Sequence, residues 1–157
     1  MKRMFDQAVT AHREGRLKEA EKLYQSILKN QPTNIDVYNN LGVLLFTLGR
    51  LDEAEASYRK AIEIKPDYAE AHSNLGNTLK NLRRLDEAEA SFRKAIEIKP
   101  DYVEAHNNLG SSLQDLGRLD EAEAGYRKVI EIKPDYVKAH KNLGILLKQK
   151  RLLSKIE

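Results

Sequence analysis

The 157-residue chain contains no cysteine, only four prolines and no long run of apolar residues. Without cysteine it forms no disulfide and offers no thiolate chemistry. No apolar stretch approaches the roughly 18 residues of a membrane-spanning helix, so we expect no membrane partner. The opening residues, Met1 to Asp6, carry charge, and no apolar segment of the kind found in secretory signals follows them. A cytoplasmic location is therefore the expectation.

Charge of one sign is also scarce, because 27 basic and 24 acidic residues nearly cancel to a net charge of +3. This balance does not favour nucleic acid as a partner. The basic excess is local and falls in residues 137–157. This segment contains one acidic residue, Glu157, and six basic ones: Lys138, Lys141, Lys148, Lys150, Arg151 and Lys155. Such an end is either a solvated helix or a site for an anionic partner.

The few prolines are regularly spaced: Pro32, Pro66, Pro100 and Pro134 follow one another at intervals of 34 residues. The period predicts one array built from a repeated unit, with four full copies and a half copy: 1–34, 35–68, 69–102, 103–136 and 137–157. An array of this kind has no single globular core, because each unit contacts only its neighbours. We therefore expect function on the surface that the stacked units create.

Each unit is expected to form two helices, as the third unit illustrates. Apolar or small residues recur at helical spacing from about residue 69 to residue 82. Asp67 and Glu70 match a capping box at the start of this helix. Gly49 and Gly117 end the first helix of their units, where a left-handed residue is favoured. Arg83 holds the same place in the third unit, at an expected cost of about 1 kcal/mol.

The second helix of the third unit is expected to begin near Asp86 or Glu87 and to end before Pro100. Glu89 and Arg93 are one turn apart and should form an ion pair. Gly76 in the first helix is small where the two helices must cross closely, and the Phe92 ring can fill the space that it leaves.

These features resemble the tetratricopeptide repeat, a helix–turn–helix of 34 residues. The residues of the second unit that carry the resemblance are Tyr38, Leu41, Gly42, Ala54, Tyr58, Ala61 and Pro66. The resemblance spans the whole chain and implies an all-α, right-handed solenoid. It further implies that the first helices line a concave groove that binds a peptide or a protein segment.

The two ends depart from this pattern. The first unit has Gln7 and Ala11 where leucine is usual, which suits a solvated N-terminal cap. The last unit has only a first helix, and we expect Leu143, Leu147 and Leu153 to face a second helix that is missing. Three alternatives stay open: this half unit caps the array, the natural chain continues, or the edge pairs with another molecule, including a second copy.

No group of residues in the sequence predicts catalysis, a metal or a cofactor. His72, His106 and His140 recur at one packing position, and equivalent points on stacked helices lie about 8–10 Å apart, too far to share a zinc ion. Ser111 and Ser112 have no histidine or lysine partner at a meaningful spacing. The repeated Asp-Glu pairs are charges at helix starts rather than an acid and a base. We therefore expect that the chain is not an enzyme.

Asparagines provide the strongest functional signal, because one occupies the sixth position of four successive units: Asn40, Asn74, Asn108 and Asn142. Asparagine is a mediocre helix former, so four copies in register need a reason. An amide both donates and accepts, as does each unit of a peptide backbone. Plain inheritance through duplication is the alternative. The predicted peptide-binding set also includes Asn39, Asn77, Asn107 and Lys138.

The asparagine ladder is similar to that of the superhelical arm in O-linked N-acetylglucosamine transferases and related bacterial proteins. Residues 8–17 also resemble the first repeat of those bacterial proteins. The alternative function is therefore a substrate-recognition arm of such a transferase, whose catalytic domain is absent here. The co-chaperone carboxylate clamp matches less well, because Ser73 and Asn142 stand where that clamp has basic residues. The expected ligand is an extended segment, partly apolar and partly acidic, bound weakly.

Overall fold

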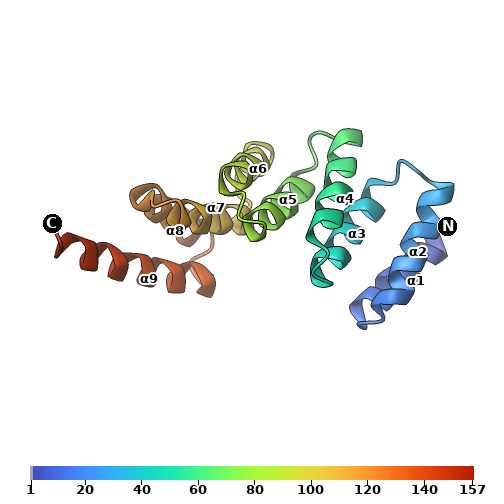
Figure 1. The fold of residues 1–157 in the computed structure, drawn as a ribbon, viewed down its shortest axis with the longest axis horizontal. Helices are drawn as coiled ribbons and strands as arrows, with labels where there is room; N and C mark the ends of the chain where they lie inside the picture. The colour runs from blue at the N-terminus through green and yellow to red at the C-terminus, as the bar shows by residue number, and fades with distance from the viewer. Residues whose placement is uncertain (1) are drawn as a thin grey trace.

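The computed structural model describes residues 2–157, which form nine α-helices and no strand. The helices are α1 (Lys2–Arg13), α2 (Leu17–Asn30), α3 (Ile35–Thr47), α4 (Leu51–Ile64), α5 (Ala69–Asn81), α6 (Leu85–Ile98), α7 (Val103–Asp115), α8 (Leu119–Ile132) and α9 (Val137–Ser154). Figure 1 shows them stacked one after another along the chain. The expected all-α solenoid is confirmed. No helix within residues 2–157 is both long and apolar enough to cross a membrane.

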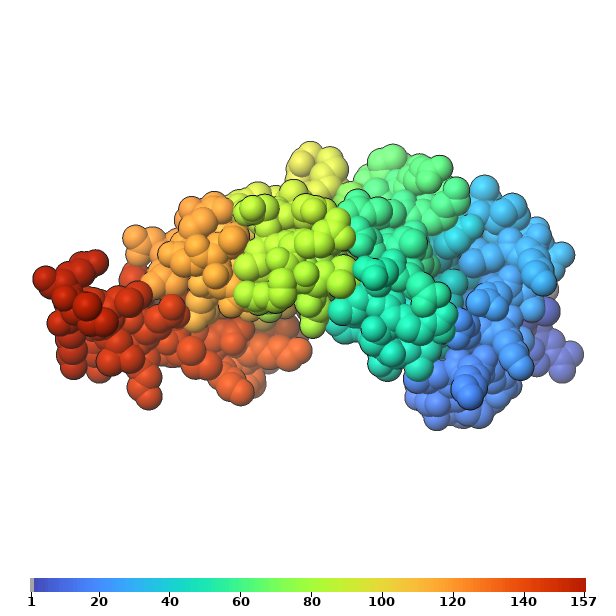
Figure 2. Space-filling model, in the orientation of Figure 1, coloured from blue at the N-terminus to red at the C-terminus, as the bar shows by residue number. Residues whose placement is uncertain are grey.

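The solenoid is curved, and its first helices lie on the inner side of the curve. The backbone of each odd-numbered helix packs close to that of the next odd-numbered helix. Within residues 2–157, successive even-numbered helices lie farther apart and meet through long side chains, such as those of Arg59 and Glu87. The stack is therefore tighter along α1, α3, α5, α7 and α9. We call the surface of these five helices the inner face. Figures 1 and 2 show the resulting arch, with α1 and α2 at one end and α9 at the other.

Within a unit, the two helices cross where a glycine meets an aromatic ring. A Cβ added at Gly76 would lie 2.7 Å from a carbon of the buried Phe92 ring, and one added at Gly110 would lie equally close to the Tyr126 ring. No side chain fits in that space, so glycine is required by the close approach. The packing predicted for Gly76 and Phe92 is confirmed, and the same contact recurs in three successive units.

The helix ends confirm one sequence prediction and correct another. Arg83 has φ of 63°, close to the values of Gly49 and Gly117, so it occupies the left-handed conformation as expected. The capping box predicted for Asp67 was wrong, because the residue before α5 is Tyr68, and its side chain makes no capping hydrogen bond. Asp67 lies one residue too early, inside the turn that the Tyr68 N–H closes on the Lys65 carbonyl.

Arginines join each second helix to the second helix before it. Arg84 contacts Glu55 of the preceding unit at 2.8 Å and Glu87 of its own unit at 2.6 Å. Arg50 and Arg118 repeat the arrangement, with 2.9 Å from Arg50 to Glu21 and 2.6 Å from Arg118 to Glu89. The predicted pair of Glu89 and Arg93 is also present, at 2.9 Å. These charges form a separate cluster at each junction between successive units on the outer face.

The N-terminal end of the solenoid is polar. In later units the third, seventh and tenth positions are largely buried against the preceding unit, as Ala71, Leu75 and Thr78 show. The first unit places polar side chains there, among them Gln7 and Thr10, and both are exposed. Gln7 therefore behaves as predicted for a solvated cap, whereas Ala11 is buried in the core between α1 and α2.

The C-terminal end is different, because α9 continues for 18 residues where the other first helices after α1 have 13. The turn glycine of the inner units is absent, and helical Arg151 stands in its place. Leu143 packs on the core at 9% exposure, but Leu147 is 39% and Leu153 is 46% exposed. The expectation of an uncovered helix therefore holds for Leu147 and Leu153 and fails for Leu143, which α7 and α8 bury.

Candidate binding face

The four asparagines at the sixth position all lie on the inner face, one on each first helix from α3 to α9. They are half-buried, so part of each amide reaches the surface: Asn40, Asn74, Asn108 and Asn142. We call this row the asparagine ladder. It connects neighbouring units because the first helices approach one another along this side of the arch.

Two members of the ladder are held by a second row of buried asparagines. The Asn74 Nδ2 group donates to the Asn39 side-chain oxygen at 3.1 Å, and Asn142 donates to Asn107 at 3.2 Å. Asn39 is only 2% exposed and Asn107 only 5%. Each bond uses one amide N–H and fixes the orientation of the outer amide. Two residues of the predicted binding set thus lie beneath the surface and support its outer members.

The other two members of the ladder have no such support. The position that would accept a hydrogen bond from Asn40 is occupied by Phe5, whose side chain is not polar. The corresponding position for Asn108 is occupied by Ser73, whose side chain is much shorter and is 4% exposed. The ladder therefore alternates between amides that bond to a buried asparagine and amides that do not. The sequence carries this alternation in the Asn-Asn doublets at 39–40 and 107–108, which the ladder alone does not reveal.

The remaining members of the predicted set lie at different depths. Asn77 is half-buried on α5, and Lys138 is exposed in the first turn of α9. Lys138 lies with the exposed Lys141 and Lys148 at the basic end of the solenoid. The opposite end of the inner face is apolar, where Phe5 and Val43 are half-buried.

Two polar contacts that the sequence analysis missed also join adjacent first helices. The Lys80 ammonium donates to the Ser111 hydroxyl at 2.7 Å, and the Gln114 amide donates to Gln149 at 2.9 Å. The expectation that Ser111 lacks a lysine partner was therefore wrong, since stacking brings a lysine of the preceding unit to it. An ammonium that donates to a hydroxyl is not a base, so this contact links two helices rather than activating a nucleophile.

The three repeated histidines each hold the turn that precedes their helix. Their Nε2 atoms lie 2.8, 2.7 and 2.6 Å from the carbonyl oxygens of Pro66, Pro100 and Pro134, with His72, His106 and His140 as the respective donors. Tyr38 makes the equivalent bond to Pro32 at 3.0 Å. Each histidine therefore belongs to its own turn, and the side chains do not converge on a shared site.

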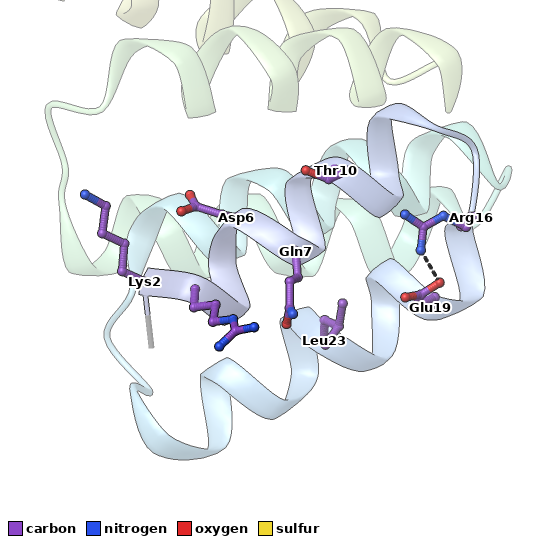
Figure 3. Close-up of a pocket in the computed structure, with 8 residues that line it drawn as sticks. Lys2, Asp6, Gln7, Thr10, Arg16, Glu19 and Leu23 are labelled. Atoms are coloured by element: carbon purple, nitrogen blue, oxygen red, sulfur yellow. Dashed lines mark hydrogen bonds and ion pairs between the residues drawn. The ribbon is translucent and has the colours of Figure 1, made fainter.

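A prominent hollow lies beside α1 and α2 rather than on the ladder. Figure 3 shows its polar lining, where Asp6, Gln7 and Thr10 come from α1 and Glu19 from α2. Arg16 already pairs with Glu19. This hollow belongs to the solvated N-terminal end described above. We therefore place the candidate binding face on the ladder, where polar groups recur in register.

The fold and this face define a class: an α-helical repeat protein whose inner face carries one row of polar side chains. Models of the tetratricopeptide repeat match residues 23–56, 69–102 and 103–136, and a TPR-repeat model matches residues 44–82. Together these matches run without a gap from residue 23 to residue 136. The chain belongs to the tetratricopeptide repeat family, and no curated protein sequence matches it.

Solved structures of the same fold cover most of the chain. A crystal structure of MamA is similar at 25% identity and a TM-score of 0.86, over 98% of this chain and 84% of that one. YrrB, titled as a TPR protein with an unusual peptide-binding site, is similar at 23% identity and a TM-score of 0.78, over 94% and 76% of the two chains. The first TPR of Spaghetti (RPAP3), bound to the HSP90 peptide SRMEEVD, is similar at 24% identity and a TM-score of 0.73, over 74% and 93%.

Proposed function

We propose that this chain is a protein-interaction scaffold that binds an extended peptide segment along the asparagine ladder. The observation that carries the proposal is the pair of buried asparagines, Asn39 and Asn107, which hold the amides of Asn74 and Asn142 at the surface. A polar side chain whose orientation is fixed in advance loses less conformational entropy when a ligand binds. Buried support of this kind is not needed by residues that are merely solvated.

The spacing of the ladder supports an extended ligand. Stacked helices lie about 10 Å apart, and an extended peptide rises about 3.3 Å per residue. Successive asparagines therefore meet the ligand backbone about every third residue. Two proteins of the same fold support the same use of this chain, because the first TPR of RPAP3 is bound to an HSP90 peptide and YrrB has an unusual peptide-binding site.

The ladder also sets the expected strength of binding. Hydrogen bonds of this kind contribute about 1 kcal/mol each, and ordering of the peptide offsets part of the gain. The expected dissociation constant is then about micromolar to millimolar. The exposed lysines of α9 favour acidic residues at one end of the ligand, and half-buried Phe5 and Val43 favour apolar residues at the other.

A grip on a C-terminal carboxylate is not part of the proposal. Ser73 and Asn142 have uncharged side chains, so neither supplies the positive charge that such a grip needs. The proposal includes no catalytic step. A cytoplasmic location, the transferase-arm alternative and self-association through the C-terminal end stay predictions.

The test starts from short random peptides selected on the full chain, because no ligand is identified. The best binders are labelled and titrated against the Asn74→Ala/Asn108→Ala variant, with helix content checked by circular dichroism. We expect affinity to fall by about tenfold or more, since two hydrogen bonds are lost. Lys94→Ala, on the exposed outer face of α6, serves as the matched control. The control should bind as tightly as the unchanged chain, and unchanged affinity in the asparagine variant would overturn the proposal.

A further inference from the structure

The face of α9 that carries Gly144 and Leu147 is uncovered, although the same face is covered in every inner unit. A Cβ at Gly144 would meet nothing within 4 Å, whereas at Gly76 it would meet the Phe92 ring at 2.7 Å. Leu147 is 39% exposed, but the equivalent Leu79 and Leu113 are 1% and 2% exposed. The end of the solenoid therefore displays the two-residue notch that elsewhere receives an aromatic side chain. We call Gly144 and Leu147 the open notch.

The inner units show what kind of element fits the open notch. In the third unit α6 covers this face with three fully buried residues, Ala88, Phe92 and Ala95. The two alanines lie four residues before and three residues after the ring, which places all three on one side of a helix. The open notch continues an interface that α4, α6 and α8 already define. We propose that it binds an amphipathic helix of a partner protein, with an aromatic side chain seated against Gly144.

Charge supports an acidic helix and argues against a second copy of α9. Between Val137 and Ser154 the helix carries five basic residues and no acidic one. The covering helix α6 carries four acidic and two basic residues. Two α9 helices packed together would bring like charges into contact, which is unfavourable, whereas an acidic helix complements the exposed Lys148 and Arg151.

The contrast between the two ends gives independent support. At the N-terminal end the positions that would face a preceding unit are polar, as exposed Gln7 and Thr10 show. At the C-terminal end the positions that would face a following helix stay Gly144 and Leu147. A solvent-exposed helix surface usually carries polar side chains, and an apolar patch on an exposed helix is typical of an interaction site. The open notch retains the residues of a covered face.

The experiment titrates a labelled, end-capped peptide with the sequence of α6, residues 85–98, into the full chain and measures fluorescence anisotropy. Its helix is held by a lactam bridge between Glu89 and a lysine introduced as Arg93→Lys, both on the outer side of α6. We expect saturable binding that weakens more than tenfold when the protein carries Gly144→Leu, because leucine fills the space that the ring needs. The structure tolerates this change, since a Cβ added at Gly144 meets nothing within 4 Å.

Two controls separate this site from the ladder. A peptide with Phe92→Ala should bind more than tenfold more weakly, and protein with Asn74→Ala/Asn108→Ala should bind the original peptide within twofold of the unchanged chain. The proposal is overturned if no saturable binding is seen, or if Gly144→Leu binds as well as the unchanged chain. It is equally overturned if sedimentation shows a dimer of the chain that Gly144→Leu abolishes, because the occupant is then a second copy.

Discussion

Lys150 Nζ lies 2.7 Å from Glu123 Oε2 and thereby ties the last helix to the helix before it. In the inner units the corresponding glutamate is held by an arginine at the start of the next second helix, as Arg84 holds Glu55. The last unit has no such helix in residues 2–157, and Lys150 on the continuous α9 makes the contact in its place. It also reaches Asp120, at 2.6 Å.

Replacing Lys150 should loosen α9 without unfolding the rest of the solenoid. Because the pair is partly exposed, Lys150→Met is expected to cost little of the overall stability. Hydrogen exchange should become faster for the α9 amides and stay unchanged for α5 and α6. Lys148→Met, an exposed lysine on the same helix, is the control. Equal effects of the two substitutions would contradict a structural role for the Lys150 contact.

Glycine at the eighth position should be required in one unit and dispensable in another. Gly76→Ala places a methyl group 2.7 Å from the Phe92 ring, so we expect a loss of about 1–3 kcal/mol from overpacking. Gly144→Ala meets nothing within 4 Å, and the better helix former should raise stability by up to about 1 kcal/mol. Urea denaturation measures both changes. Similar losses in the two variants would disprove the contrast between a covered and an open glycine.

The strained turn at Arg83 offers a stabilising substitution. Its φ of 63° disfavours any side chain, so Arg83→Gly should raise the unfolding free energy by about 1 kcal/mol. Its ion pair with Asp115 is long, at 3.5 Å, and the Arg83 side chain is 69% exposed, so little is lost with it. Gly117→Arg makes the opposite change at the same position of the next unit and should destabilise the chain. The midpoint of thermal unfolding measures both.

Stability should fall in two stages as the solution is acidified. Burial lowers the pKa of His12 below its ordinary value of 6.5. The stability contributed by neutral His12 is therefore fully present above about pH 6.5 and is lost as the pH falls through the lower pKa of the folded state. Lys150 and Arg127 lower the pKa of Glu123. Its contribution is present above the unfolded value of about 4.3 and is lost at lower pH.

The first stage can be removed by one substitution. His12 Nδ1 lies 3.3 Å from the Tyr24 hydroxyl, and Gln114 makes the equivalent bond to Tyr126 at 3.0 Å. His12→Gln therefore copies a contact that the chain already uses and has no titrating group. Urea unfolding between pH 7 and pH 3 should lose the upper stage and keep the lower one. Persistence of the upper stage in this variant would show that another group causes it.

Features that repeat within one unit could be predicted from the sequence, and contacts between units could not. Local residue types predict the packing of Gly76 on Phe92 and the strain at Arg83. They also predict the repeat unit itself, through the interval between Pro66 and Pro100. Burial of Asn39 depends on which sides of α3 and α5 come together, since its partner Asn74 is 35 residues away. The contacts of Lys80 with Ser111 and of Arg50 with Glu21 depend on the same stacking, which no single unit reveals.

The most direct test of the account maps a selected peptide onto the full chain by nuclear magnetic resonance. Side-chain amide signals report the ladder itself, because Asn74, Asn108 and Asn142 each carry a separate Nδ2 group. The account predicts that the largest shifts on titration occur at these amides and at neighbouring amides of α5 and α7. Shifts confined to the outer face, along α4, α6 and α8, with the asparagine amides unmoved, would contradict binding along the ladder.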